Sequence, residues 1–494
     1  MDAAILFFLS SGLFLGWSLG ANDAANVFGT AVGTRMVRFA TAAAICSVFV
    51  ILGAVFGGSG AAHTLGKLGS VNALGGSFMA AFAAALSVYL MTKAGLPVST
   101  TQAIVGAIIG WNLFSETRTD TDTLITILST WIICPVLAAV LAAILFKITI
   151  YVVRVARPHL LRQDAYTRVG LILAGAFGAY SLGANNIANV VGVFVPASPF
   201  TDFSFFGLGT FSSIQQLFLL GAIAIAVGVI TYSRGVMMTV GGRIMPLSPV
   251  AAWVVVVAHS LVLFIFASEG LEALLAGAGL PTIPLVPVSS SQAVVGAVLG
   301  IGLLKGGRSI RWQMLGGIGT GWVLTPIIAG LVCFVGLFFL QNVFNQEVQR
   351  PVTYVLSDTV LERLEREGVQ PAAAGDLKGK TFETAWALQD ALEENTEFDI
   401  RSRDKILRFA EIHEMRIDPD EIPRLDSDWM SRGQISAVAH LAGKRFTHRW
   451  QLDEALAAES EEWRLLPRIA VNKPFNKELR KKLDSLYRKF EIAP

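Results

Sequence analysis

Amide side chains recur inside two apolar runs of the sequence, and the first run also contains a carboxylate. The first run reads Ser-Leu-Gly-Ala-Asn-Asp-Ala-Ala-Asn over residues 18–26, and the second reads Ser-Leu-Gly-Ala-Asn-Asn-Ile-Ala-Asn over 181–189. Buried polar groups need partners, because an unpaired one in an apolar setting costs several kcal/mol. Oxygen ligands suit a small hard cation. The candidate cation or anion ligands are therefore Asn22, Asp23, Asn26, Asn185, Asn186 and Asn189, with Asp23 as the candidate sodium ligand.

Hydroxyl side chains form a second matched pair of motifs. Residues 96–102 read Leu-Pro-Val-Ser-Thr-Thr-Gln, and residues 286–292 read Val-Pro-Val-Ser-Ser-Ser-Gln. Proline suits the start of a helix, so each run is expected to open a half-helix whose N-terminus attracts anions. Rotating hydroxyls can fit a tetrahedral oxyanion. The candidate phosphate-binding residues are Ser99, Thr100, Thr101, Ser289, Ser290 and Ser291, and Gln102 and Gln292 are candidates for phosphate or cation.

Packing is the alternative explanation for such clusters, since Ser and Thr in membrane helices often bond only to the preceding turn. Two matched clusters after the matched prolines Pro97 and Pro287 favour a binding site over packing. His63 and His259 are isolated; either could relay a proton, but a structural or interfacial role is the more economical interpretation of each.

The elements that must position these motifs are membrane helices. Hydrophobic residues make up 53% of the chain and charged residues 15%, which is too few charges for a soluble protein. Shorter apolar pieces after Pro97 and Pro287 predict half-helices, and pieces after Asn26 and Asn189 could be similar. An all-α membrane protein with ten to twelve transmembrane or broken helices is expected. The predicted full spans are 3–20, 39–57, 74–92, 123–153, 166–184, 213–232, 249–267 and 312–344.

The two halves of this membrane region are predicted to be inverted repeats. The motifs occur in the same order in both halves, but the equivalent loops differ in charge. The loop after the first hydroxyl motif is acidic, whereas the loop after the second carries Lys305, Arg308 and Arg311. The positive-inside rule then gives the halves opposite orientations. The expected domains are a first transmembrane repeat at 1–150, a cytoplasmic linker at 151–165, an inverted second repeat at 166–346 and a soluble domain at 347–494.

The C-terminal region differs in composition from the rest of the chain. Only nine of the 37 acidic residues precede residue 347, so most of the charge lies in the last third. Residues 379–392 resemble 443–456, which predicts two similar, mostly helical units. Phe382, Trp386, Phe446 and Trp450 recur at matching places and are expected in their cores.

At its four motifs the sequence resembles the inorganic phosphate transporter family, the Pit-type permeases. The resemblance covers roughly residues 1–345 and implies a twelve-helix, inverted-repeat carrier that moves phosphate with sodium or protons. Two departures leave the coupling ion open. The family's second signature usually has Asn-Asp where this chain has Asn185-Asn186, and many animal relatives have a glutamate where this chain has Phe49-Val50.

Inverted repeats with broken helices are typical of secondary transporters that work by alternating access. The expected function is import of phosphate with a cation, either sodium or a proton, across the cytoplasmic membrane. The alternatives are another oxyanion such as sulfate, or a phosphate-binding sensor that signals through the C-terminal domain. An enzyme has no support, since no nucleophile–base or metal-ligand spacing is visible, and no cofactor is expected. The expected partners are phosphate and the lipid bilayer but no nucleic acid; a homodimer and an unidentified partner of the C-terminal domain stay open.

Overall fold

The protein is described by a computed structural model that divides into two compact units. Unit 1 comprises residues 1–115, 119–271 and 283–349, and unit 2 comprises 116–118, 272–282 and 350–494. The residues that the structure describes are 3–69, 71–94, 98–196, 198, 200, 203–204, 210–243, 245–369, 377–395, 400–426, 429–467 and 469–492. Pro97 and the side chain of His63 lie outside this set.

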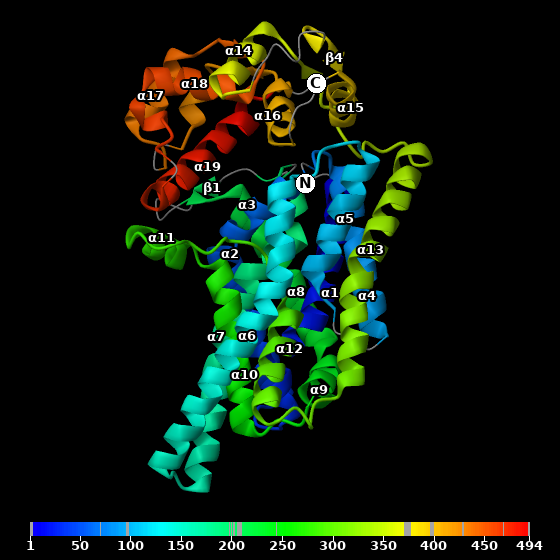
Figure 1. Cartoon of the computed structure of the whole chain (residues 1–494), viewed down its shortest axis with the longest axis vertical. Coiled ribbons are helices and arrows are strands. Elements are labelled where there is room, and N and C mark those ends of the chain that lie inside the picture. The colour runs from blue at the N-terminus through cyan, green and yellow to red at the C-terminus, as the bar shows by residue number, and fades with distance from the viewer. Residues whose placement is uncertain are drawn as a thin grey trace. The chain divides into compact units, whose positions relative to one another are not determined.

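Unit 1 is built from helices, which are shown in Figure 1. The first half contains α1 (Ala3–Gly33), α2 (Phe39–Gly57), α3 (Ser59–Leu68), α4 (Leu74–Lys93), α5 (Thr100–Phe114) and α6 (Thr121–Ala156). The second half contains α7 (Leu160–Val191), η1 (Gly192–Phe194), β1 (Phe203–Ser204), β2 (Thr210–Phe211), α8 (Ser213–Thr231), α9 (Ser233–Arg243), α10 (Pro249–Ala267), α12 (Ser290–Leu304) and α13 (Trp312–Asn342). Helix α11 (Glu269–Gly277) begins in unit 1, and its residues from 272 onward belong to unit 2.

Within the described part of the chain, eight helices are long and apolar enough to cross a membrane: α1, α2, α4, α6, α7, α8, α10 and α13. They coincide with the eight full spans that the sequence predicts, because runs of about 20 apolar residues are a strong signal. The protein is therefore an all-α, multi-pass membrane protein, as expected.

Helices α5 and α12 are the two half-helices. Each has 15 residues, which at 1.5 Å per residue is about 22 Å. That length is shorter than the hydrocarbon core of a bilayer, which is about 30 Å thick. Both helices begin at the hydroxyl motifs, so the predicted half-helices after Pro97 and Pro287 are confirmed.

The suggestion of half-helices after Asn26 and Asn189 is wrong. Helix α1 continues without a break from Ala3 to Gly33, and α7 continues from Leu160 to Val191. The reason is that the amide side chains bond mainly to neighbouring helices, as described below, so the backbone ladder of each helix need not open to satisfy them.

The two halves pack against each other reciprocally through glycines. A Cβ on Gly20 of α1 would lie 2.0 Å from the Ile225 carbonyl oxygen of α8. A Cβ on the equivalent Gly183 of α7 would lie 2.1 Å from the Val50 carbonyl oxygen of α2. Only glycine allows so close a helix–helix approach. Equivalent positions thus make equivalent contacts across the two halves.

The half-helices also pack reciprocally, each against a helix of the opposite half. A Cβ on Gly106 of α5 would lie 2.1 Å from the carbonyl oxygen of Pro326 in α13, and one on Gly296 of α12 would lie 2.2 Å from that of Pro135 in α6. Each half-helix therefore packs on the last long helix of the opposite half. The equivalent helices α6 and α13 run in opposite directions in Figure 1, which is the arrangement of an inverted repeat.

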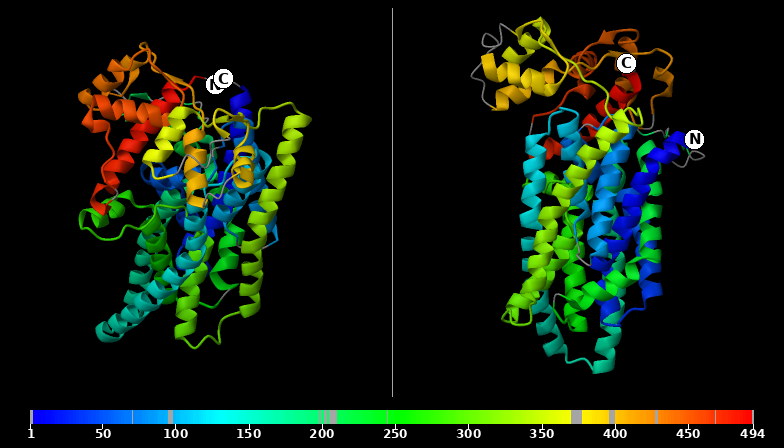
Figure 2. Two further views of the ribbon diagram at one scale, coloured as in Figure 1. Left: turned by 45° about the horizontal axis from the view of Figure 1, so that its top comes forward. Right: turned by 90° about the vertical axis from the view of Figure 1, so that its right-hand side faces the viewer.

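Unit 2 contains two segments with the same order of elements. The first contains β3 (Tyr354–Val355), α14 (Asp358–Arg366), β4 (Thr381–Phe382), α15 (Ala385–Asn395) and α16 (Ile400–Ala410). The second contains β5 (Met415–Arg416), η3 (Ile422–Arg424), α17 (Arg432–His440), β6 (Arg445–Phe446), α18 (Arg449–Glu459), η4 (Glu461–Trp463), η5 (Ala470–Asn472) and α19 (Lys473–Phe490). Strand β3 pairs antiparallel with β4, and β5 pairs antiparallel with β6. Figure 2 shows these short strands and helices from two further sides.

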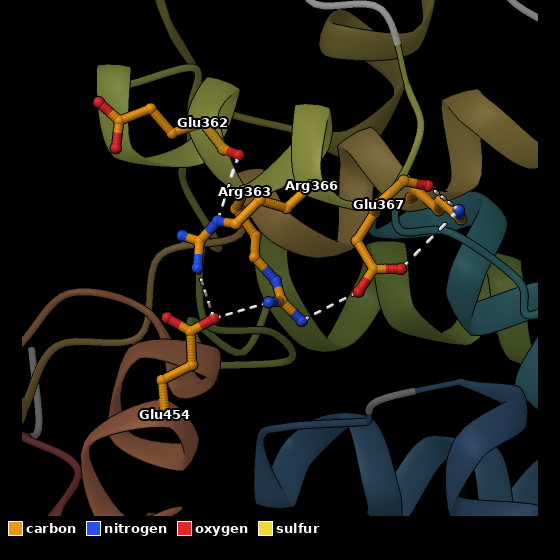
Figure 3. Close-up of polar contacts among 6 residues, drawn as sticks. Glu362, Arg363, Arg366, Glu367 and Glu454 are labelled. Atoms are coloured by element: carbon orange, nitrogen blue, oxygen red, sulfur yellow. Dashed lines mark hydrogen bonds and ion pairs between the residues drawn. The ribbon is translucent and has the colours of Figure 1, made fainter. Parts of the chain in front are cut away.

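Ion pairs join the two segments of unit 2, as Figure 3 shows. Arg363 of α14 donates to Glu454 of α18 at 2.6 Å and to Glu367 at 3.0 Å. The Arg363 guanidinium also lies 5.3 Å from the ring centroid of Phe409. These partly exposed contacts orient the segments more than they stabilise them, since such pairs contribute at most about 1 kcal/mol each.

The expected core role of Trp386 is wrong, because 41% of this residue is exposed. The buried stripe of α15 passes through Ala385, Leu388 and Leu392, so a side chain at 386 falls beside it rather than on it. Phe382, Phe446 and Trp450 are partly buried and pack against the hydrophobic clusters of unit 2.

Candidate functional site

The N-termini of α5 and α12 meet inside unit 1. Ser99 and Ser289 are the N-cap residues, and each side chain accepts a hydrogen bond from the backbone N–H three residues later at 3.2 Å. The hydroxyl of Thr101 in α5 donates to the carbonyl oxygen of Val288, just before α12, at 3.3 Å. Two positive helix ends therefore converge on one place, which favours a bound anion.

The amide motif of each half bonds to the hydroxyl motif of the other half. The Asn26 amide of α1 donates to Ser290 Oγ of α12 at 3.1 Å. The Asn189 amide of α7 donates to Thr101 Oγ1 of α5 at 2.8 Å. All four side chains are at most 2% exposed. The four motifs predicted from the sequence are thus brought together at the interface of the two repeats.

Asp23 lies at the edge of this network and is 2% exposed. Its Oδ1 lies 3.5 Å from the Asn26 amide nitrogen. At the equivalent place in the second half, Asn186 Oδ1 accepts from the Asn189 amide at 2.9 Å. The geometry of the two halves is therefore matched, while only the first half carries an ionisable group at this position.

Several buried oxygen atoms of the site have no hydrogen-bond partner within the described residues. An unpartnered buried oxygen is costly and accepts either a hydrogen-bond donor or a cation. These atoms fit the oxygen ligands that a small cation requires. They are Asn22 Oδ1, Asn26 Oδ1, Asn189 Oδ1, Gln102 Oε1, Gln292 Oε1 and Thr100 Oγ1.

Other predicted residues form hydrogen bonds within unit 1. The Asn185 side chain accepts from the backbone N–H of Val288 at 3.0 Å, and this contact fixes the extended segment that leads into α12. The Asn22 amide donates to Thr92 of α4 at 2.8 Å. Ser291 Oγ lies 3.1 Å from Ser289 Oγ. These bonds hold the side chains and the segment before α12 in position, and each side chain keeps polar atoms that are not used in them.

His259 was missed by sequence reasoning, which treated it as an isolated histidine. It is fully buried in α10, and its Nε2 lies 3.0 Å from Ser290 Oγ. The signal available in the sequence was its position in an apolar run, where an ionisable residue indicates function by default. Nothing in the sequence indicated that α10 would pass beside the hydroxyl motif.

Groups of three or more His, Cys, Asp or Glu that could hold a metal do not occur in the described ranges. Among the predicted site residues Asp23 is the carboxylate, and the others carry neutral amide or hydroxyl groups.

Comparison with known proteins gives the chain a family. A profile described as "Phosphate transporter family" matches residues 19–333 and 273–397. The protein named "Putative phosphate permease" in Methanocaldococcus jannaschii is 30% identical over 68% of this chain and 97% of its own length. The "Sulfate permease CysP" of Bacillus subtilis is 28% identical over 76% of this chain and 99% of its own length.

The fold is also known from a solved structure. "The sodium-dependent phosphate transporter" superposes with a TM-score of 0.56, at 23% identity, over 69% of this chain and 99% of that chain. These relatives are permeases and transporters rather than enzymes. Because the profile matches more than half of the sequence, the chain belongs to the phosphate transporter family.

Proposed function

We propose that the protein is a secondary carrier that moves phosphate together with a cation, sodium or a proton, by alternating access of its two repeats. The observation that supports this most is the cross-pairing of the motifs. Asn26 bonds to Ser290 and Asn189 bonds to Thr101, so each half contributes to one buried site. A site shared by two inverted halves can open to either side when the halves rock.

The chemistry of the site favours a tetrahedral oxyanion. Two helix N-termini and the hydroxyls at 99, 100 and 289–291 supply donors without a lysine or arginine in the motifs, while the Thr101 proton is already donated to Val288. Phosphate held by dipoles and neutral donors can leave again. Asp23 and the unpartnered amide oxygens provide a place for the cation, whose charge would in turn improve the anion site.

Basic residues gather at one end of unit 1. The α6–α7 turn and the α12–α13 connection both lie at the lower end in Figure 1. Lys305 Nζ lies 5.0 Å from the Phe146 ring of α6, and the Arg234 guanidinium lies 6.0 Å from the Phe39 ring of α2. In the cytoplasmic membrane, where we place the carrier, the positive-inside rule orients this end towards the cytoplasm.

The test is uptake of labelled phosphate into proteoliposomes that contain the full chain. One set has an inward sodium gradient and the other an inward proton gradient. Uptake driven by one gradient alone identifies the coupling ion. Phosphate binding without uptake under either gradient would contradict a coupled carrier and favour the sensor hypothesis.

Sulfate is the second candidate substrate, because the B. subtilis relative named as a sulfate permease covers 76% of this chain. Competition separates the two anions in the same proteoliposomes. If phosphate is the substrate, unlabelled phosphate suppresses the uptake of labelled phosphate and a tenfold excess of sulfate does not. The reverse ranking would assign the carrier to sulfate.

A further inference from the structure

His259 contacts the anion site through one hydroxyl. Its Nε2 is 3.0 Å from the oxygen of Ser290, the first residue of α12. The side chain is fully buried, and its Nδ1 has no hydrogen-bond partner within the described residues. Asn26 donates to the same Ser290 oxygen at 3.1 Å. Ser290 is therefore held from two sides, by α1 and by α10.

The number of bonds that a hydroxyl can make then decides where its proton points. A serine hydroxyl has one donor proton and two acceptor lone pairs. The Asn26 amide uses one lone pair. If His259 Nε2 carries a proton, it uses the second lone pair, and the Ser290 proton must point elsewhere. If Nε2 carries none, the Ser290 proton points at His259.

The unpartnered Nδ1 distinguishes these two tautomers. A proton on Nδ1 would leave a buried N–H without an acceptor, which is rarer and more costly than an underused acceptor atom. The neutral imidazole is therefore protonated on Nε2, which donates to Ser290. The Ser290 proton is left to face the space where the two helix N-termini converge.

We propose that His259 is a positioning residue that fixes the Ser290 hydroxyl as a donor to the transported oxyanion. This inference rests on the proposed function, because it assumes an anion between α5 and α12. The first half has no such arrangement at the equivalent residue: Thr100 Oγ1 has no partner in the described part of the chain. The site thus combines one fixed hydroxyl donor with one that can rotate.

Two substitutions of nearly equal size test the role of the donor. In His259→Gln the amide nitrogen takes the place of Nε2 and still donates, whereas His259→Met fills a similar volume without a donor. We expect KM for phosphate to rise about 10- to 100-fold in H259M, because Ser290 loses the neighbour that keeps its proton directed at the anion, and its charge-assisted hydrogen bond is weakened. In H259Q the KM should stay within about threefold of wild type, and kcat should change little in both.

A double-mutant cycle separates this role from general packing. In a Ser290→Ala background the H259M effect on KM should disappear, because the hydroxyl that His259 positions is gone. Ser260→Ala is the control, since Ser260 neighbours His259 on α10 but bonds to the Val256 carbonyl at 2.6 Å. If H259M fails to fold, as judged by size-exclusion chromatography, His259→Asn provides a second variant whose donor is too short to reach Ser290.

The possible results are distinct. Equal KM values in wild type, H259Q and H259M would overturn the positioning role of His259 alone. So would additive effects of H259M and S290A. Normal phosphate binding by H259Q with loss of proton-driven uptake would also overturn it, and would make His259 a proton carrier. A wild-type chain that binds neither phosphate nor sulfate in calorimetry would instead refute the proposed function.

Discussion

Asp23 and Asn186 occupy equivalent positions in the two repeats, yet only Asp23 can carry a charge. Both are buried, and each faces the amide of the asparagine three residues later. The second half thus shows that an amide is structurally acceptable at this position. A change of Asp23 to asparagine should therefore alter charge and leave packing intact.

We predict that Asp23→Asn lowers cation-driven phosphate uptake by about 100-fold or more, equivalent to about 2.7 kcal/mol. The reason is that the site loses the carboxylate that would balance a bound cation. The measurement is initial uptake in proteoliposomes under sodium and proton gradients. An unchanged melting temperature would show that the variant is folded, and wild-type cation dependence would contradict the role of Asp23.

At the scale of single residues, the sequence predicts site residues where polar side chains occur within apolar runs. The amide and hydroxyl motifs stand out because polar groups in apolar runs need partners. Which partner each one takes depends on helix packing. The pairs Asn26–Ser290 and Asn189–Thr101, and the approach of His259, could therefore not be predicted. Trp386 was misplaced because a repeated sequence pattern does not fix which face of a helix is buried.

At the scale of elements, two matched features hold the site: the half-helices, and the glycines through which they pack on α13 and α6. A methyl group on Gly296 would lie 2.2 Å from the backbone oxygen of Pro135, and backbone cannot move aside as a side chain can. The N-terminus of α12 is therefore positioned by the contact of its middle with α6.

We predict that Gly296→Ala destabilises the protein by roughly 3 kcal/mol or more, because overpacking against backbone is poorly relieved. Gly319→Ala on α13 is the matched control, since a Cβ there meets nothing within 4 Å of it among the described residues. That change should be neutral or stabilise by up to about 1 kcal/mol. Thermal unfolding in detergent measures both, and equal melting temperatures would contradict the packing argument.

The elements were largely predictable from the sequence. The length of each apolar run predicts a membrane-spanning helix. Pro97 and Pro287, which precede the hydroxyl motifs, predict the start of each half-helix. The continuation of α1 past Asn26 was not predicted. Polar side chains within a run indicate a break only if their partners are backbone groups, and here the partners lie largely on other helices.

At the scale of the whole molecule, the charges of equivalent loops in the sequence predict the inverted repeat. For unit 2 the sequence predicts two similar helical units but not how their side chains pack. Its titratable cluster was not foreseen, because His413, Glu411 and Glu491 are brought together by strand and helix packing.

The His413 cluster gives unit 2 a pH dependence. Burial alone would lower the pKa of His413, but its hydrogen bonds to Glu411 at 2.9 Å and Glu491 at 3.0 Å raise it above the ordinary value. A raised folded-state pKa stabilises the fold below the unfolded pKa of about 6.5, and this stabilisation is lost as pH rises through the folded value.

We therefore predict that unit 2 becomes less stable as pH rises above about 6.5, by less than about 1 kcal/mol, because Glu491 is more than a third exposed. Hydrogen exchange of residues 411–492 in the full chain, corrected for intrinsic rates, measures this. His413→Gln should remove the dependence, whereas the exposed His440→Gln should not. A pH dependence that survives in H413Q would assign the effect to another group.

The division of the chain also predicts where it can be shortened. Every candidate site residue belongs to unit 1, so a chain that ends after Arg350 should take up phosphate with a KM within about twofold of wild type. The cut must not be earlier. Val348 is buried, and its carbonyl oxygen accepts from the Trp111 indole at 3.0 Å.

A chain that ends after Asn345 would leave that buried indole N–H unpaired, at a cost of about 1–3 kcal/mol. Its melting temperature should therefore be lower than that of the chain that ends after Arg350. Comparing transport and melting temperature of the two chains separates the effect of unfolding from the effect of removing the C-terminal units. If the longer truncation folds with the wild-type melting temperature but no longer transports, unit 2 takes part in the transport cycle. That result would contradict the prediction that unit 1 transports phosphate without unit 2, and it would revive a functional role for the C-terminal domain.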